Sequence, residues 1–298
     1  MVSATTIICE NPDDSYFNQQ WELQKIHVPQ ALNSSQANKS IKIAILDSGI
    51  DFRHEDLTAK TVAEINFTDS ETTMDEYGHG TAVAGIVAAS ANNNQGISGV
   101  GYDASLMNVK VLGDKGGGSY TWIIQGIIWA TDNGANIINL SLEGGVDSTN
   151  LKKATEYAWN KGVLIVVASG NSGSSVYTFP AGYEYCIAVA ATDRNDHKYP
   201  YSNYGDWVDV TAPGYAYSTL VGNKYGKIRG TSIAAPYVSG LAALAFNIAR
   251  DNNGDGKLND EVRAAIENGC DPVADPGTGK GRINAFKTLA GLISTQIN

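Results

Sequence analysis

Basic residues are few in this sequence. Its 21 lysines and arginines are outnumbered by 31 aspartates and glutamates, which gives a formal net charge of −10 over 298 residues. No basic stripe is present to neutralise phosphates, so the charge argues against nucleic acid as the main partner. We expect no nucleic-acid partner, and the charge suits a solvated enzyme better.

Long hydrophobic runs are also scarce. We read no apolar run as long enough to span a membrane, and residues 1–9 lack the basic start of a signal peptide. The sequence therefore predicts no membrane partner, and it shows no export signal.

The chain has only three cysteines, Cys9, Cys186 and Cys270. Their odd number leaves at least one thiol unpaired within the chain, and the sequence does not reveal the connectivity. Cys186 lies in an apolar run, where we expect a small buried hydrophobic residue. Internal repeats and long linkers are lacking too, so with 43% hydrophobic residues we expect one large core in a single domain.

Strand-like and helix-like segments alternate along the chain. Short apolar runs rich in β-branched residues predict strands at 41–46, 105–112, 137–142, 163–168, 186–191 and 207–210. Longer patterns predict helices at 79–90, 120–133, 150–160 and 232–250. This alternation is typical of an α/β fold, in which a parallel sheet carries helices on both faces and ligands bind beyond the carboxyl ends of the strands.

Three distant segments contain the groups that activate a serine. Asp47 follows the first expected strand, while His79 and Ser232 each open an expected helix. A carboxylate, an imidazole and a hydroxyl together make serine a nucleophile at neutral pH, and a helix start adds N–H groups that stabilise negative charge. Each segment alone is ordinary turn chemistry, but the three together indicate acyl transfer.

The residues around these segments resemble the subtilisin-like serine proteases, and most closely their thermitase-like members. The resemblance extends from about Pro12 to Ser294. Its motifs are Asp47-Ser48-Gly49-Ile50-Asp51, Gly78-His79-Gly80-Thr81, Tyr157-Ala158-Trp159-Asn160-Lys161-Gly162, Ala168-Ser169-Gly170-Asn171 and Gly230-Thr231-Ser232-Ile233-Ala234-Ala235-Pro236. It implies a three-layer α/β/α fold with a mainly parallel central sheet. The implied single peptidase domain spans 1–298, with an N-terminal extension at 1–11 and a catalytic part of about 12–294.

The resemblance assigns a catalytic role to four residues. It makes Ser232 the nucleophile, His79 the general base and then acid, and Asp47 the group that orients the imidazole. Asn171 falls where the family places its oxyanion donor. The alternative is a loop asparagine that tolerates a left-handed turn after a strand.

The implied activity is that of a serine endopeptidase acting on a peptide or protein substrate in extended conformation. A peptide ligase or cyclase on the same scaffold is an alternative, because an amine can intercept the acyl-enzyme. A non-enzymatic binding module is a third reading, which the intact catalytic residues oppose. We expect a monomer. Family members are often trimmed of an export signal and a pro-segment, so we expect an extracellular mature form, with a cytoplasmic protein as the alternative.

Two segments look like the cleft walls that pair with an extended peptide in this family. They are Gly116-Gly117-Gly118-Ser119-Tyr120 and Ser141-Leu142-Glu143-Gly144. Glycine leaves the backbone free to pair with a peptide, although a plain flexible loop is the alternative for the glycine run. By the same resemblance, Tyr120 shelters a hydrophobic subsite and Thr178 lies near the floor of the primary pocket.

Glu143 departs from the family, in which glycine is usual at this position. Our hypothesis is that its carboxylate faces the substrate groove and favours a basic residue in the peptide. The competing interpretation is that it points to solvent, as most charged loop residues do.

The resemblance also implies calcium as a cofactor. The matching parts of the strong family site are Asp14, Asp56 and the loop 90–97, with the Asn93 amide and the backbone carbonyls of Ser90, Gln95 and Ile97 as further ligands. The alternative interpretations are a solvated asparagine-rich turn and a helix cap at Asp56.

Two weaker cation sites are also considered. One lies near Asn66, Asp69 and Glu71, in a loop shorter than that of thermitase-like proteins. The other is the loop of Asp251, Asn253 and Asp255, which begins like an EF-hand but has Val262 at its twelfth position. A plain turn before a helix that starts near Asp260 is the alternative for this second loop.

Overall fold

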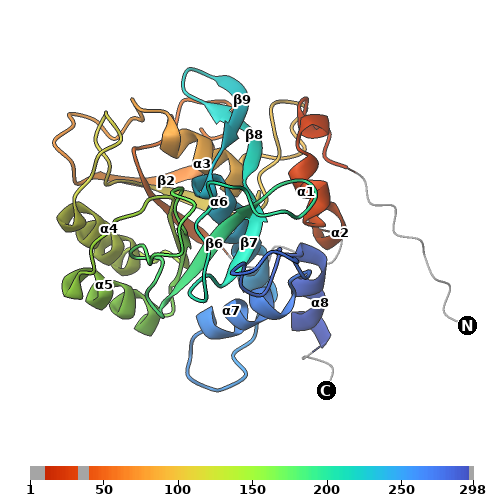
Figure 1. Cartoon of the computed structure of the whole chain (residues 1–298). Coiled ribbons are helices and arrows are strands. Elements are labelled where there is room, and N and C mark those ends of the chain that lie inside the picture. Colours follow the sequence, from red (N-terminus) through yellow and green to blue (C-terminus); the bar gives the residue numbers. More distant parts are fainter. Residues whose placement is uncertain (1–10, 33–39, 295–298) are drawn as a thin grey trace, which may run out of the picture.

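A computed structural model of the chain describes residues 11–32 and 40–294. Its central feature is a parallel sheet of seven strands in the order β2-β3-β1-β4-β5-β6-β7. In chain order these strands are β1 Lys42–Asp47, β2 Thr61–Asn66, β3 Ser105–Lys110, β4 Ile137–Leu140, β5 Leu164–Ala168, β6 Cys186–Thr192 and β7 Val210–Pro213. An antiparallel hairpin, β8 Tyr215–Leu220 and β9 Lys224–Arg229, projects beyond the sheet (Figure 1).

Helices cover both faces of this sheet. One hydrophobic cluster joins the sheet to α1 Trp21–Lys25, α2 Val28–Leu32, α3 His79–Ala88, α6 Thr231–Ile248, α7 Asn259–Asn268 and α8 Ala285–Ser294. A second cluster joins the opposite face to α4 Tyr120–Asp132 and α5 Thr149–Asn160, and Figure 1 shows these two helices side by side. The expected three-layer α/β/α architecture is thereby confirmed.

Strand β1 shows how the sequence creates the two faces. Ile43 and Ile45 belong to the cluster under α3 and α6, whereas Ala44 and Leu46 belong to the cluster under α4 and α5. Side chains alternate along a strand, so a strand covered on both faces must be apolar at every position. The continuous apolar run of the sequence is the consequence.

The element boundaries differ from the prediction at several points. The strand expected at 207–210 begins only at Val210 and continues to Pro213, because Trp207 and Val208 pack from the preceding turn against the face that carries α4 and α5. Strand β2 was not predicted, since its residues alternate between half-buried and exposed at the sheet edge. Helix α6 is long and apolar enough to cross a membrane, judged by length and composition alone, so the expectation of no such run is wrong. In the described structure 89% of it is buried in the core.

Candidate active site

Asp47 and His79 are in direct contact. Asp47 is the fully buried last residue of β1, and its Oδ1 and Oδ2 lie 2.8 Å and 2.9 Å from His79 Nδ1. Oδ1 also accepts the Ser48 backbone N–H at 2.7 Å. The carboxylate is therefore fixed from two sides and holds one edge of the imidazole.

The contact requires the start of α3 to pack closely on the end of β1. A Cβ at Gly80 would lie 2.1 Å from the Gly49 carbonyl oxygen and 3.1 Å from Asp47 Cβ, so only glycine fits at that position. Gly78, the residue before His79, has a φ of 95°, which favours glycine as well. The Gly-His-Gly sequence is thus a geometric requirement of the Asp47–His79 pair.

Two carboxylates act on the charge of the imidazole. Burial lowers the pKa of His79, but the neighbouring Asp47 and the more distant Asp75 outweigh it, so the pKa of His79 lies above its ordinary value. A histidine with this bias gains a proton readily once a nucleophile releases one.

Asp75 organises the turn that leads into α3. Its Oδ1 accepts the Ser48 hydroxyl at 2.8 Å and the Gly78 N–H at 2.7 Å, and its Oδ2 accepts the Thr81 N–H at 2.8 Å and the Thr81 hydroxyl at 2.7 Å. Ser48 Oγ in turn accepts the Gly80 N–H at 3.0 Å. Asp75 and Ser48 thus satisfy the backbone donors around His79, because the N-cap residue Gly78 has no side chain to do so.

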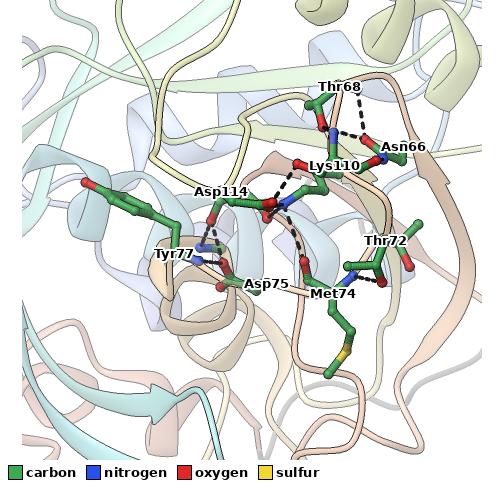
Figure 2. A network of polar contacts seen from close by, with 12 residues as sticks. Asn66, Thr68, Thr72, Met74, Asp75, Tyr77, Lys110 and Asp114 are labelled. Carbon is green, nitrogen blue, oxygen red and sulfur yellow. Dashed lines mark hydrogen bonds and ion pairs between the residues drawn. The ribbon is translucent and has the colours of Figure 1, made fainter.

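Lys110 carries a buried positive charge into the same region. It ends β3, is fully buried, and its Nζ donates to the Ser48 carbonyl, to the Met74 carbonyl at 3.3 Å and to Asp114 Oδ1 at 3.0 Å. Figure 2 shows the ammonium between Met74 and Asp114, beside the turn that carries Asp75. One lysine therefore ties the turn after β1 to the loop before α3.

Ser232 lies in the first turn of α6, after Gly230, whose φ of 144° is also unfavourable for other residues. Its hydroxyl donates to the Ser141 carbonyl at 3.1 Å, and the Ser141 hydroxyl donates to the Ser232 carbonyl at 2.8 Å. Within the described part of the chain no hydrogen bond joins Ser232 to His79, although both line one cleft. Such bonds are often absent until substrate binds.

Asn171 is held by the residue that precedes the serine. Its Oδ1 accepts the Thr231 N–H at 2.9 Å and the Thr231 hydroxyl at 3.1 Å. With the oxygen fixed in this way, the Nδ2 donors of the amide are left without a partner among the described residues, beside Ser232 on the cleft wall. This is the arrangement that an oxyanion donor needs.

A cleft of about 550 Å³ brings most of the predicted site residues together. It is lined by Tyr77, His79, Leu112, Gly116, Gly117, Gly118, Tyr120, Ile123, Ser141, Leu142, Glu143, Gly144, Ala168, Gly170, Asn171, Thr231 and Ser232. Thr178, expected at the floor of the pocket, does not line it. Its side chain is buried, and its hydroxyl donates to the Ser169 carbonyl at 2.8 Å.

The sequence interpretation missed Tyr77, Leu112 and Ile123. Tyr77 is 54% exposed, and its ring lies so close to Gly116 that a Cβ there would be 2.5 Å away. The only signal in the sequence that Tyr77 could line the cleft is its position two residues before His79. Tyr120 lines the cleft as expected, and its hydroxyl donates to the Val146 carbonyl at 2.7 Å.

Asp14 and Asp56 come together at the other expected site, far along the chain from each other. Asp56 is fully buried, and its carboxylate accepts the Ile97 N–H at 3.0 Å, whereas Asp14 accepts the N–H groups of Asn92 and Asn93, both at 3.2 Å. Burial raises the pKa of both carboxyl groups, and for Asp14 the nearby Asp56 adds to the effect.

The oxygens around this pair suit calcium. In the described structure the carbonyl oxygens of Ser90, Gln95 and Ile97 accept no hydrogen bond, and no group of three or more His, Cys, Asp or Glu side chains that would hold a metal is present. Two carboxylates with carbonyl oxygens are a donor set that calcium prefers. The Asn93 amide must turn to take part, because its Nδ2 now donates to Asp56 at 3.2 Å.

The two weaker cation loops use their polar groups internally. In the first, Asn66 Oδ1 accepts the Thr68 N–H at 2.8 Å, and Asp69 and Glu71 are exposed. In the second, Asp251 accepts the N–H groups of Gly254 at 2.7 Å and Gly256 at 2.8 Å. Asn253 Oδ1 accepts the Asp255 N–H at 2.9 Å, and Lys257 already neutralises Asp255 at 3.0 Å. These internal contacts are those of ordinary polar turns, and they explain the conformation of both loops without a cation.

Three comparisons with known proteins agree with one another. The profile described as "Subtilase family" matches residues 38–281. Thermitase of Thermoactinomyces vulgaris is 43% identical over 283 residues, which cover 93% of this chain and 99% of that protein. A thermophilic serine proteinase of Bacillus sp. (strain AK1) is 41% identical over 93% of this chain and 69% of its own length. A solved protease from Pseudoalteromonas arctica PAMC 21717 superposes with a TM-score of 0.85 at 28% identity, covering 95% of this chain and all of the other.

Proposed function

The chain belongs to the subtilase family and is a subtilisin-like serine endopeptidase, and from this premise we propose that Asp47, His79 and Ser232 are its catalytic triad. The observation that carries the proposal is the paired contact of Asp47 with His79 Nδ1, at 2.8 Å and 2.9 Å, in the cleft that also contains Ser232. Because Asp47 holds the Nδ1 proton, Nε2 is the nitrogen that is free to act as a base.

The reaction begins when the Ser232 hydroxyl leaves the Ser141 carbonyl and turns toward His79. His79 Nε2 takes the proton as Ser232 Oγ attacks the peptide carbonyl carbon, and Asp47 stabilises the imidazolium that forms. The Asn171 Nδ2 amide and the Ser232 backbone N–H stabilise the oxyanion. His79 then protonates the leaving amine as the carbon–nitrogen bond breaks, which leaves the acyl group on Ser232 Oγ. Water then attacks this ester while His79 takes its proton, and His79 returns the proton to Ser232 Oγ as the acid product leaves.

We propose further that an extended peptide lies between the segments 116–120 and 141–144. The glycines Gly116, Gly117, Gly118 and Gly144 leave backbone groups accessible to a pairing strand. The ligase and binding-module alternatives have no specific feature of the cleft in their favour. Monomeric state and action outside the cell belong to the same proposal, and sedimentation and fractionation of the producing culture test them.

A structural calcium ion is part of the proposed function. The carboxylates of Asp14 and Asp56, the carbonyls of Ser90, Gln95 and Ile97, and the Asn93 amide would hold it. When bound, the ion supplies positive charge between two buried carboxylates and links the N-terminal segment to the loop after α3. It takes no part in the chemical steps.

A serine-reactive fluorophosphonate probe tests the triad directly. We expect labelling of the wild-type protein at Ser232 and none of Ser232→Ala, with peptide cleavage lost in the same variant. His79→Ala should label at least about 10³-fold more slowly, because the serine loses its base. Wild-type protein that folds but neither labels nor cleaves would refute the assignment.

A further inference from the structure

Glu143 is the only carboxylate among the described residues that line the cleft. It belongs to the wall Ser141–Gly144, two residues after the carbonyl that holds the Ser232 hydroxyl. Lysine and arginine are absent from the described lining, and Glu143 forms no ion pair with any described residue. A single uncompensated negative charge therefore lies in the cleft that also contains Ser232.

The Glu143 carboxylate reaches from the segment 141–144 to the segment 170–171, which also lines the cleft. Its Oε1 accepts the Asn171 backbone N–H at 3.4 Å, which is a weak hydrogen bond, and a Cβ added to Gly170 would lie 1.9 Å from Oε2. Beyond this point the segment 141–144 is joined to the chain that follows Asn171, because Gly144 and Phe179 exchange two backbone hydrogen bonds of 2.8 Å. The carboxylate thus lies between the segments 141–144 and 170–171.

The position of the Glu143 carboxylate beside Asn171 determines which substrate side chain can contact it. In the proposed mechanism the attacked carbonyl lies between Ser232 and the Asn171 amide, and the Glu143 carboxylate contacts the backbone of Asn171 itself. An arginine or lysine side chain extends roughly 6 Å from its Cα, as its bond lengths allow. The side chain of the residue that supplies the scissile carbonyl is therefore the one that reaches Glu143.

From these contacts we infer that Glu143 makes the protein prefer arginine or lysine at the residue on the acyl side of the cleaved bond. The inference rests on the proposed function. A basic side chain replaces the weak Asn171 contact with a charge-assisted hydrogen bond in a partly enclosed space. A substrate glutamate at the same position is repelled by the like charge of Glu143. An apolar substrate residue is tolerated there because the exposed Glu143 carboxylate can turn toward water.

The test uses peptides that differ only at that residue: arginine, lysine, glutamine, leucine or glutamate. We expect wild-type kcat/KM for arginine and lysine to exceed that for glutamine by about tenfold or more, with the preference weakening at high salt. Glu143→Gln keeps an acceptor for the Asn171 N–H but removes the charge. In this variant kcat/KM should fall about tenfold for the arginine and lysine peptides and change by less than twofold for the leucine peptide.

Two further variants separate charge recognition from a structural effect. Glu143→Lys should invert the ranking and prefer the glutamate peptide. Glu184→Gln removes an exposed carboxylate outside the cleft, whose Oε1 lies 3.6 Å from Lys152 Nζ, and should leave the ranking as it is in the wild type. Equal cleavage of basic and neutral peptides by wild type and Glu143→Gln overturns the specificity inference but leaves the endopeptidase intact. Wild-type protein that cleaves none of the peptides and does not react with the fluorophosphonate overturns both.

Discussion

The Asp75 carboxylate accepts the Ser48 hydroxyl at 2.8 Å, although 27 positions separate the two residues. Ser48 directly follows Asp47, and Asp75 binds the backbone of Gly78 and Thr81 on either side of His79. The pair therefore joins the strand that ends in Asp47 to the helix that begins with His79. Two members of the proposed triad owe their relative position to residues that touch neither substrate nor reacting atoms.

The first prediction concerns Asp75→Asn. We expect kcat to fall by at least about tenfold, because a small displacement of the general base is costly. The pH profile should shift as well. Asp75 helps to raise the pKa of His79, and activity needs neutral His79, so the acidic limb of kcat/KM in the wild type lies above pH 6.5, the ordinary value, and moves to lower pH in the variant.

The control for this prediction is Asp114→Asn. Asp114 contacts the buried Lys110 at 3.0 Å but none of the backbone donors around His79 that Asp75 satisfies. This variant should leave the acidic limb in place. A limb at the same pH in Asp75→Asn and the wild type would show that Asp75 has no electrostatic influence on His79.

The second prediction concerns Asn171→Ala. In a subtilisin, removal of one oxyanion donor costs about 10²–10³ in kcat, and we expect a loss of that size with little change in KM. Asn171→Asp keeps the oxygen that accepts the Thr231 N–H at 2.9 Å but replaces the amide donors with negative charge. Its kcat should therefore be no higher than that of Asn171→Ala. Steady-state kinetics on one peptide measures both, and a variant that turns over at the wild-type rate would exclude Asn171 from the oxyanion site.

The residues in these two predictions differ in whether the sequence alone identified them. Asp47, His79 and Ser232 were predicted because strand ends and helix starts place short motifs at one edge of a parallel sheet, whereas Asn171 was predicted from the family resemblance. Asp75 was not singled out, since an acidic residue in a polar loop gives no sign in the sequence that its carboxylate will accept the Ser48 hydroxyl and several backbone N–H groups.

Residues whose role depends on packing were the least predictable. Lys110 ends an apolar strand, and only the fold places its ammonium beneath the turn after β1. The buried Cys186 agrees with the sequence prediction, while Cys9 lies outside the described residues. The resemblance gave the neighbourhood of Thr178 but not the direction of its side chain, whose hydroxyl donates to the Ser169 carbonyl at 2.8 Å.

The third prediction concerns calcium. Chelation should lower the melting temperature, because a ligand that binds only the folded state stabilises it. In Asp56→Asn the melting temperature should no longer respond to calcium. Differential scanning calorimetry with and without chelator measures the response, and Asp255→Asn should respond like the wild type because Lys257 already neutralises Asp255.

The pH dependence of the chelated protein supplies an independent check. Burial raises the folded-state pKa of Asp14 and Asp56 above the ordinary value of 3.8. Between that value and the raised pKa, the folded state therefore binds more protons than the unfolded state. The contribution of these groups to stability must then increase as the pH falls through their folded pKa toward the ordinary value of 3.8, and it is lost as the pH rises again. The melting difference between calcium and chelator should shrink on acidification, and a difference that widens would contradict the site.

The last prediction concerns Glu22, which is fully buried in α1 with neither carboxylate oxygen bonded to a described residue. Burial raises the pKa of Glu22 to about 8, from an ordinary value of 4.5. Below pH 4.5 the group is neutral in both states. Between pH 4.5 and about 8 the unfolded chain is ionised while the folded chain is not, so stability falls as the pH rises through this range and levels off above it.

Glu22→Gln removes this titration and keeps the shape of the side chain. It should flatten the pH dependence of unfolding by urea and be more stable than the wild type near pH 9, where the wild-type carboxylate is charged and buried with no partner among residues 11–32 and 40–294. The exposed replacement Glu184→Gln should follow the wild-type curve. If Glu22→Gln and the wild type lose stability in parallel between pH 5 and pH 9, Glu22 is already ionised in the folded protein and must have a partner that neutralises it.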